Sequence, residues 1–170
     1  MSKISYSTVG FSDRDVDAAL DAIAVAGFDQ AEILGQTPHL EELPSEPALT
    51  DFRVRLESRG LAGGTVHAPL TRNVLGAPEE DWRREKVGVL TGYLRFAAAI
   101  EATDIIIHPV PNPRFVPAAD HPDTPQLIAD AVHRSLDDLV PVAAEVGVRI
   151  LLENLPYDCL YPFLTMKELR

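Results

Sequence analysis

Residues 148–153 read VRILLE, an almost unbroken apolar run that ends on a carboxylate. Such a run is typical of a strand that is covered on both faces, as in a parallel sheet. Similar short runs precede it at Ile4–Val9, Ala31–Leu34, Leu61–His67 and Asp104–His108. The segments between these runs space their apolar residues as amphipathic helices do. Strands that alternate with helices predict an α/β fold with one parallel sheet.

Capping and stop signals place the helices between these strands. They are expected at residues 12–27, 49–58 and 79–102, and from residue 124 to 147. Ser12 is the predicted N-cap of the first helix, and Thr124, which precedes a proline, is the predicted N-cap of the last. We expect Pro141 to kink or interrupt the last helix, because proline removes one backbone hydrogen bond.

The chain is expected to form a single domain over residues 1–170, since 46% of its residues are hydrophobic and no change of composition marks a linker. Thr165 and Glu168 predict a capping box that opens a helix with room for only one turn. A complete (β/α)8 barrel needs about 250 residues. We therefore expect the first five βα units of such a barrel. Either the chain is a fragment of a longer protein, or a partner chain such as a homo-oligomer completes the sheet.

The overall charge and composition exclude several classes of partner. A formal net charge of -11 disfavours binding to nucleic acid or to anionic lipid. The single cysteine, Cys159, excludes an internal disulfide and fits a reducing compartment, so a cytoplasmic location is expected. The sequence contains no apolar run of about 18 residues that would cross a membrane.

Polar residues occur where the predicted strands end, namely His67, His108 and the pair Glu153-Asn154, with Glu32 inside the second run. In a parallel barrel these strand ends face the same rim. Imidazole nitrogen and carboxylate oxygen are suitable ligands for zinc, manganese, iron or cobalt, and magnesium is a further candidate. The pattern therefore predicts a divalent-metal site of His67, His108 and Glu153. Glu32, Asn154 and the two histidines are the predicted substrate-binding residues.

Each of these residues also has a structural interpretation. A single histidine at a strand end is more often a hydrogen-bonded structural residue than a metal ligand. Glu32 could simply bond to a neighbouring loop. Glu153 is different, because a carboxylate that ends a buried strand needs a cation or hydrogen-bond donors to compensate its charge. The complete set therefore favours a functional site more than any one member does.

The remaining histidines and basic residues are interpreted as surface groups. The histidines without a nearby ligand partner, expected to be solvated, are His39, His121 and His133. The basic residues that alternate with acidic ones, expected to form a solvated helical face, are Arg72, Arg83, Arg84 and Lys86.

Three segments of the chain resemble a known family. Residues 64–69 (GTVHAP), 103–109 (TDIIIHP) and 147–156 (GVRILLENLP) are similar to the xylose-isomerase-like barrel superfamily of sugar phosphate isomerases and epimerases, which also contains endonuclease IV. Residues 22–32 resemble the first helix and second strand of that family, with Glu32 at its usual acidic position. The resemblance covers essentially the entire chain and implies a (β/α)8 TIM barrel.

The resemblance also implies roles for individual residues. Glu153 resembles the fifth-strand glutamate that binds metal throughout the superfamily. His67 and His108 match histidines that ligate zinc in the endonuclease branch and line the substrate pocket in the epimerase branch. The other ligands of the family, from the sixth, seventh and eighth strands, have no counterpart in this sequence.

Three hypotheses of function follow. The first is a metal-dependent isomerase or epimerase of a small sugar, sugar phosphate or related hydroxy-carbonyl compound, in which Glu153 binds the metal and helps to move a proton. The second is an endonuclease IV-like zinc phosphoesterase, which the acidic charge disfavours. The third is a non-catalytic barrel remnant that acts as a binding or assembly module.

Overall fold

The computed structural model describes residues 4–40, 45–70, 72 and 74–169. Within these residues the strands form one five-stranded parallel sheet in the order β1-β2-β3-β4-β5. The strands are β1 (Ser5–Ser7), β2 (Gln30–Leu34), β3 (Ala62–His67), β4 (Asp104–Ile107) and β5 (Arg149–Leu152). The helices are α1 (Val16–Val25), α2 (Glu46–Glu57), α3 (Glu80–Ala99) and α4 (Thr124–Val146), with short 3₁₀ helices η1 (Thr8–Phe11) and η2 (Pro113–Phe115).

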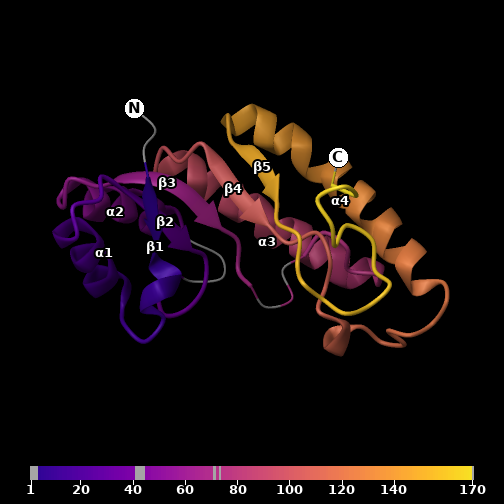
Figure 1. The fold of residues 1–170 in the computed structure, drawn as a ribbon. Coiled ribbons are helices and arrows are strands. Elements are labelled where there is room, and N and C mark those ends of the chain that lie inside the picture. Colours follow the sequence, from indigo (N-terminus) through magenta and orange to yellow (C-terminus); the bar gives the residue numbers. More distant parts are fainter. Residues whose placement is uncertain (1–3, 41–44, 71, 73, 170) are drawn as a thin grey trace.

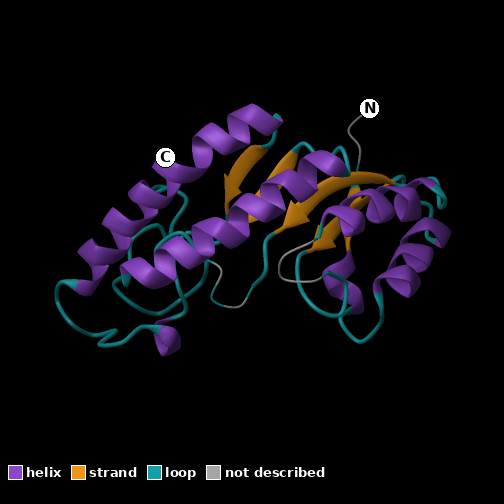
Figure 2. Cartoon of the chain, turned by 180° about the vertical axis from the view of Figure 1, so that it is seen from behind, coloured by secondary structure: helices purple, strands orange, loops and turns teal. Residues whose placement is uncertain are grey.

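Strands and helices alternate along the chain (Figure 1), and the helices lie together on one face of the sheet (Figure 2). The main core fills the space between them and includes Val66, Ile105 and Ile107, each 0% exposed. A smaller apolar cluster around Trp82 and Tyr161 lies under the loops that follow the strands. This order of parallel strands confirms the expected first part of a (β/α)8 barrel.

The first helix begins later than the sequence predicted. Asp15, rather than Ser12, is the N-cap of α1, and its carboxylate accepts a hydrogen bond from the backbone N–H of Ala18 at 2.8 Å. Residues 8–11 leave the strand and form η1, because the buried Thr8 hydroxyl accepts a hydrogen bond from Leu34 N–H at 2.9 Å. The predicted strand Ile4–Val9 is therefore shortened to β1.

Of the two effects expected of Pro141, a kink or an interruption, the interruption does not occur, because α4 continues through Pro141 to Val146. Buried residues on both sides of the proline, including Val132, Leu139 and Ala143, form one continuous packed stripe. Packing of this stripe outweighs the loss of one hydrogen bond. Asp123, rather than Thr124, occupies the N-cap position, whereas Gly147 ends the helix in a left-handed conformation with φ 73°.

Strand β5 and the segment of residues 165–169 also differ from what the sequence predicted. Leu151 on β5 is 42% exposed, whereas Leu152 packs against the main core, so only one face of β5 is covered by the described residues. Residues 165–169 form a turn instead of a helix. Glu168 nevertheless accepts hydrogen bonds from the backbone N–H of Thr165 at 3.0 Å and from its hydroxyl at 2.8 Å, which is one half of the expected capping box.

The expectation of a wholly solvated basic face on α3 is wrong for Arg83 and Lys86, each of which is 6% exposed. Their long aliphatic stems lie against neighbouring elements while the charged ends reach carboxylates. Arg83 donates to Glu80 at 2.9 Å and to Asp138 of α4 at 2.7 Å, so it ties α3 to α4. Hydrogen bonds from Arg83, and secondarily from Arg84, lower the pKa of Glu80 from 4.5 to about 2.

Replacing Arg83 with methionine should therefore destabilise the protein, since the stem is kept but the buried hydrogen bonds to Glu80 and Asp138 are lost. We expect the free energy of unfolding, measured by urea denaturation, to fall by about 1–3 kcal/mol. Arg84→Met is the matched control, because Arg84 also bonds to Glu80 but is exposed; its effect should stay within about 0.5 kcal/mol. Equal losses in the two variants would contradict this assignment.

Candidate metal centre

Three neighbouring strands place a polar residue at their carboxyl ends. His67 is the last residue of β3, and His108 and Glu153 directly follow β4 and β5. The register pairs Ile107 with Leu152, and Glu153 N–H donates to the carbonyl of Ile107 at 3.1 Å. Because side chains alternate between the faces of a strand, all three project on the face opposite to the helices.

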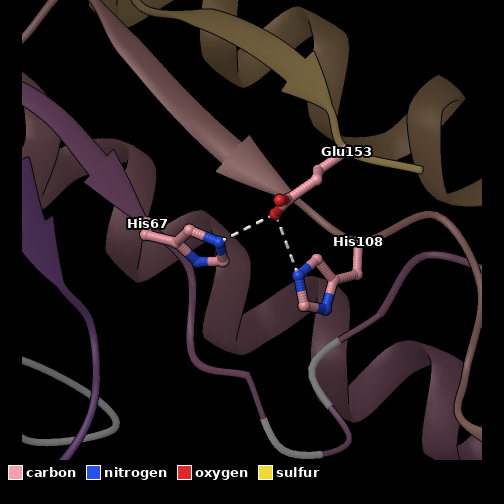
Figure 3. Close-up of side chains that lie close together, drawn as sticks. All are labelled: His67, His108 and Glu153. Carbon is pink, nitrogen blue, oxygen red and sulfur yellow. Dashed lines mark hydrogen bonds and ion pairs between the residues drawn. The ribbon is translucent and has the colours of Figure 1, made fainter. Parts of the chain in front are cut away.

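The side chains of His67, His108 and Glu153 converge on one point (Figure 3). Glu153 Oε2 lies 3.0 Å from His67 Nε2 and 3.2 Å from His108 Nε2. The two imidazole rings meet edge to face, with centroids 5.2 Å apart. One ligand atom from each residue lies within 4.8 Å of the other two. The three residues therefore form a possible metal site of two nitrogen donors and one oxygen donor.

A hydrogen bond to the backbone carbonyl of the next residue fixes the orientation of the His67 ring. His67 Nδ1 lies 2.8 Å from the carbonyl oxygen of Ala68. A carbonyl only accepts, so Nδ1 must carry the hydrogen. Nε2 is then left to face Glu153, either as an N–H donor to the carboxylate or as a lone pair toward a cation. Histidine ligands commonly have such a carbonyl partner on the second ring nitrogen.

His108 is more deeply buried, with 9% of its surface exposed. Burial lowers the pKa of His108 below 6.5, and the charge of His67 lowers it further, although Glu153 acts in the opposite direction. The neutral form of His108 is thus favoured, which leaves one ring nitrogen with a lone pair for a metal. Glu153 is the exposed member of the group, with 48% of its side chain accessible to solvent.

Glu32 and Asn154, the other predicted site residues, lie outside this cluster. Glu32 lies on β2, two residues before Leu34, which pairs with His67, so Glu32 shares the face of His67 about 6.6 Å farther from the rim. No hydrogen bond or ion pair joins Glu32 to another described residue. Asn154 Nδ2 donates to the carbonyl of Leu164 at 3.2 Å and so ties the loop that follows β5.

The structure also corrects the interpretation of His39. This residue is 3% exposed, and its Nε2 lies 3.1 Å from the carbonyl oxygen of Phe11. The loop after β2 folds back onto η1, which the sequence pattern did not indicate. His121 and His133 are exposed, as expected. None of these three belongs to the cluster of His67, His108 and Glu153.

Comparison with known proteins identifies the family to which the chain belongs. The family described as xylose isomerase-like TIM barrel matches residues 20–170, and the chain belongs to this family. A solved structure described as a D-tagatose 3-epimerase-like protein is similar to 98% of this chain, with 20% identity and a TM-score of 0.75. The 3-keto-D-glucoside 4-epimerase from E. coli matches 91% of the chain, with 20% identity and a TM-score of 0.72.

A xylose isomerase-like TIM barrel protein from Mycobacterium smegmatis, solved in complex with magnesium, is also similar: 17% identity, 91% of this chain, 57% of that one and a TM-score of 0.62. The chain spans 58% of the D-tagatose 3-epimerase-like protein and 57% of the E. coli enzyme. At these identities the likeness shows the fold. No curated protein gives a significant match.

Across the described residues, none of the helices has the length and apolar character needed to span a bilayer.

We expect the purified protein to bind Co²⁺ through this cluster. Glu153→Gln should weaken binding by about tenfold or more, because it removes the anionic ligand while keeping the shape of the side chain. The measurement is competition with a chelator of known affinity. Glu168→Gln is the control, since Glu168 bonds to Thr165 at the far end of the following loop. Equal weakening by both substitutions would contradict the site.

The lowered pKa of His108 predicts a pH dependence of the metal-free protein. Between pH 6.5 and the lower folded pKa, the unfolded chain binds the proton more readily, so the free energy of unfolding should fall as the pH falls through this window. Urea denaturation at several pH values, with a chelator present, measures this slope. His108→Gln should flatten it relative to His121→Gln, in which an exposed histidine is lost. Parallel slopes for the two variants would refute the prediction.

Proposed function

We propose that this chain carries part of the active site of a divalent-metal-dependent sugar isomerase or epimerase. The observation that carries the proposal is the convergence of His67, His108 and Glu153 at the carboxyl ends of three adjacent strands. In barrels of this kind the chemistry takes place at that rim. The carbohydrate enzymes among the similar structures support a small hydroxy-carbonyl substrate.

The donor set fits a transition metal. Two imidazole nitrogens and one carboxylate oxygen suit zinc, manganese or cobalt, whereas magnesium prefers oxygen ligands alone. We therefore favour the former metals for this chain. The neutral state of His108 and the carbonyl-bound Nδ1 of His67 leave ring nitrogens ready to ligate without a large rearrangement.

The protein's own residues would bind and orient the substrate and move a proton. A bound divalent cation would polarise the substrate carbonyl and an adjacent hydroxyl and so favour the enediolate. Glu153 Oε2 faces both histidines, whereas Oε1 makes no hydrogen bond with a described residue and so is available to a substrate hydroxyl or a proton. Glu32, deeper on the same face, would accept a hydrogen bond from a substrate hydroxyl, and Asn154 would hold the adjacent loop in place.

An endonuclease IV-like phosphoesterase is the second candidate, because two histidines with one glutamate also suit a zinc centre that activates water. The net charge of -11 disfavours a DNA substrate. A binding or assembly module without catalysis is the third.

Proton exchange tests the proposal directly. The protein is incubated in ²H₂O with Mn²⁺ or Co²⁺ and, in turn, with D-tagatose, D-fructose and L-ribulose. Exchange is followed by ¹H NMR as loss of the signal of the hydrogen on the carbon next to the carbonyl. We expect exchange that needs the metal and that Glu153→Gln slows by about 100-fold or more, while Glu168→Gln leaves it unchanged. Cleavage of DNA containing an abasic site, without sugar exchange, would favour the phosphoesterase. Metal binding with neither activity would favour the module.

A further inference from the structure

The backbone of His67 is held by a chain of two hydrogen bonds that reaches into the protein core. The N–H of Gly35, in the loop after β2, donates to the carbonyl of His67 at 2.8 Å. The hydroxyl of Tyr93, on α3, donates to the carbonyl of Gly35 at 2.6 Å. Tyr93 is 0% exposed, so no solvent competes for this bond. A buried hydroxyl thus acts on a candidate ligand through one intervening residue.

Gly35 permits this contact because it has no side chain. A Cβ atom at this position would lie 2.6 Å from Tyr93 Cε1 and 2.9 Å from the carbonyl oxygen of His67. Both distances are far shorter than ordinary van der Waals contacts. The three residues are therefore packed so closely that a displacement of Tyr93 or Gly35 must be passed on to His67.

The same arrangement recurs at His108. The N–H of Leu75, in the loop after β3, donates to the carbonyl of His108 at 3.3 Å. The hydroxyl of Ser135, on α4, donates to the carbonyl of Leu75 at 2.8 Å. Leu75 and Ser135 are each 0% exposed. Here too a fully buried hydroxyl is linked to a candidate ligand through the backbone of one loop residue.

The two arrangements occupy equivalent places in the repeat of strands and helices. In each, the histidine lies at the carboxyl end of a strand, the intervening residue lies in the loop after the preceding strand, and the hydroxyl comes from the helix that follows the histidine's strand. We propose that Tyr93 and Ser135 are positioning residues, which hold the backbone of His67 and His108 so that both Nε2 atoms face the same point. This inference rests on the metal site of the proposed function.

The physical basis is the cost of leaving a buried carbonyl without a partner. Without the Tyr93 hydroxyl the Gly35 carbonyl has to find another donor or move toward water. Such a movement shifts the backbone of His67, from which the imidazole projects. Ligand constellations tolerate a displacement of only about 0.5 Å before affinity falls. The metal site should therefore respond to these hydroxyls although neither touches it.

Removal of each hydroxyl tests the inference. The variants are Tyr93→Phe and Ser135→Ala, and the readouts are Co²⁺ affinity by chelator competition and the visible absorption spectrum of bound Co²⁺, which reports ligand geometry. We expect each variant to weaken Co²⁺ binding by about threefold to tenfold, somewhat less than substitutions of groups that bond a ligand directly. The spectrum should shift in position or intensity, which a loss of stability alone would not cause.

Two substitutions serve as matched controls. Tyr161→Phe removes a hydroxyl from another buried tyrosine, one whose oxygen has no hydrogen-bond partner among the described residues. Ser58→Ala removes a serine hydroxyl that bonds to the carbonyl of Arg55 on α2, away from both histidines. Affinity and spectrum should remain those of the unsubstituted protein in both. A change in the controls as large as in the test variants would overturn the proposal.

Further substitutions distinguish failure of the positioning role from failure of the metal site itself. On a His67→Gln background, Tyr93→Phe should weaken Co²⁺ binding no further, because its effect passes through His67. If His67→Gln and Glu153→Gln bind Co²⁺ as well as the unsubstituted protein does, the metal site itself is wrong. If they weaken binding while Tyr93→Phe and Ser135→Ala leave affinity and spectrum unchanged, only the positioning role is overturned. Should Tyr93→Phe fail to unfold cooperatively, Ser135→Ala decides by the same criteria.

Discussion

Parallel hydrogen bonding between β3, β4 and β5 is the constraint from which the candidate site follows. Residues 67, 108 and 153 are about 40 positions apart in the chain, yet the pairing of Ile107 with Leu152 brings Glu153 beside His108. Because all the strands run in one direction, their polar terminal residues meet at one edge of the sheet. A shift of one residue in either pairing would turn a ligand toward the helices and into the apolar core.

Strands β4 and β5 are also joined at their amino-terminal ends, by an ion pair. Arg149 donates to Asp104 through two nitrogens, at 2.8 Å and 3.1 Å, and this hydrogen bonding lowers the pKa of the Asp104 carboxyl. The Arg149 side chain is 75% exposed, so the contribution of the pair to stability is small. Its geometric effect is more relevant, since a two-pronged contact between directly paired residues matches only the observed register.

The residues of the candidate site differ in their exposure to solvent. His108 is buried and has a lowered pKa, which favours the neutral imidazole, whereas Glu153 remains exposed to solvent. Behind the histidines, the loops after β2 and β3 are bound to hydroxyls from α3 and α4. In the proposed site the strand ends would supply the ligating atoms, and the helix layer would supply the rigidity that two convergent imidazoles require.

Local patterning in the sequence by itself determined the parallel strands, the polar residues at their ends and the glycine that stops α4 at Gly147, because each depends on a few consecutive residues. Only the tertiary structure decided that Pro141 remains inside a helix and that His39 and Arg83 are buried. The tertiary structure also decided the links from Tyr93 and Ser135 to the histidines. These features depend on contacts between residues distant in the chain, such as the 58 positions between Tyr93 and Gly35, and no local propensity encodes such contacts.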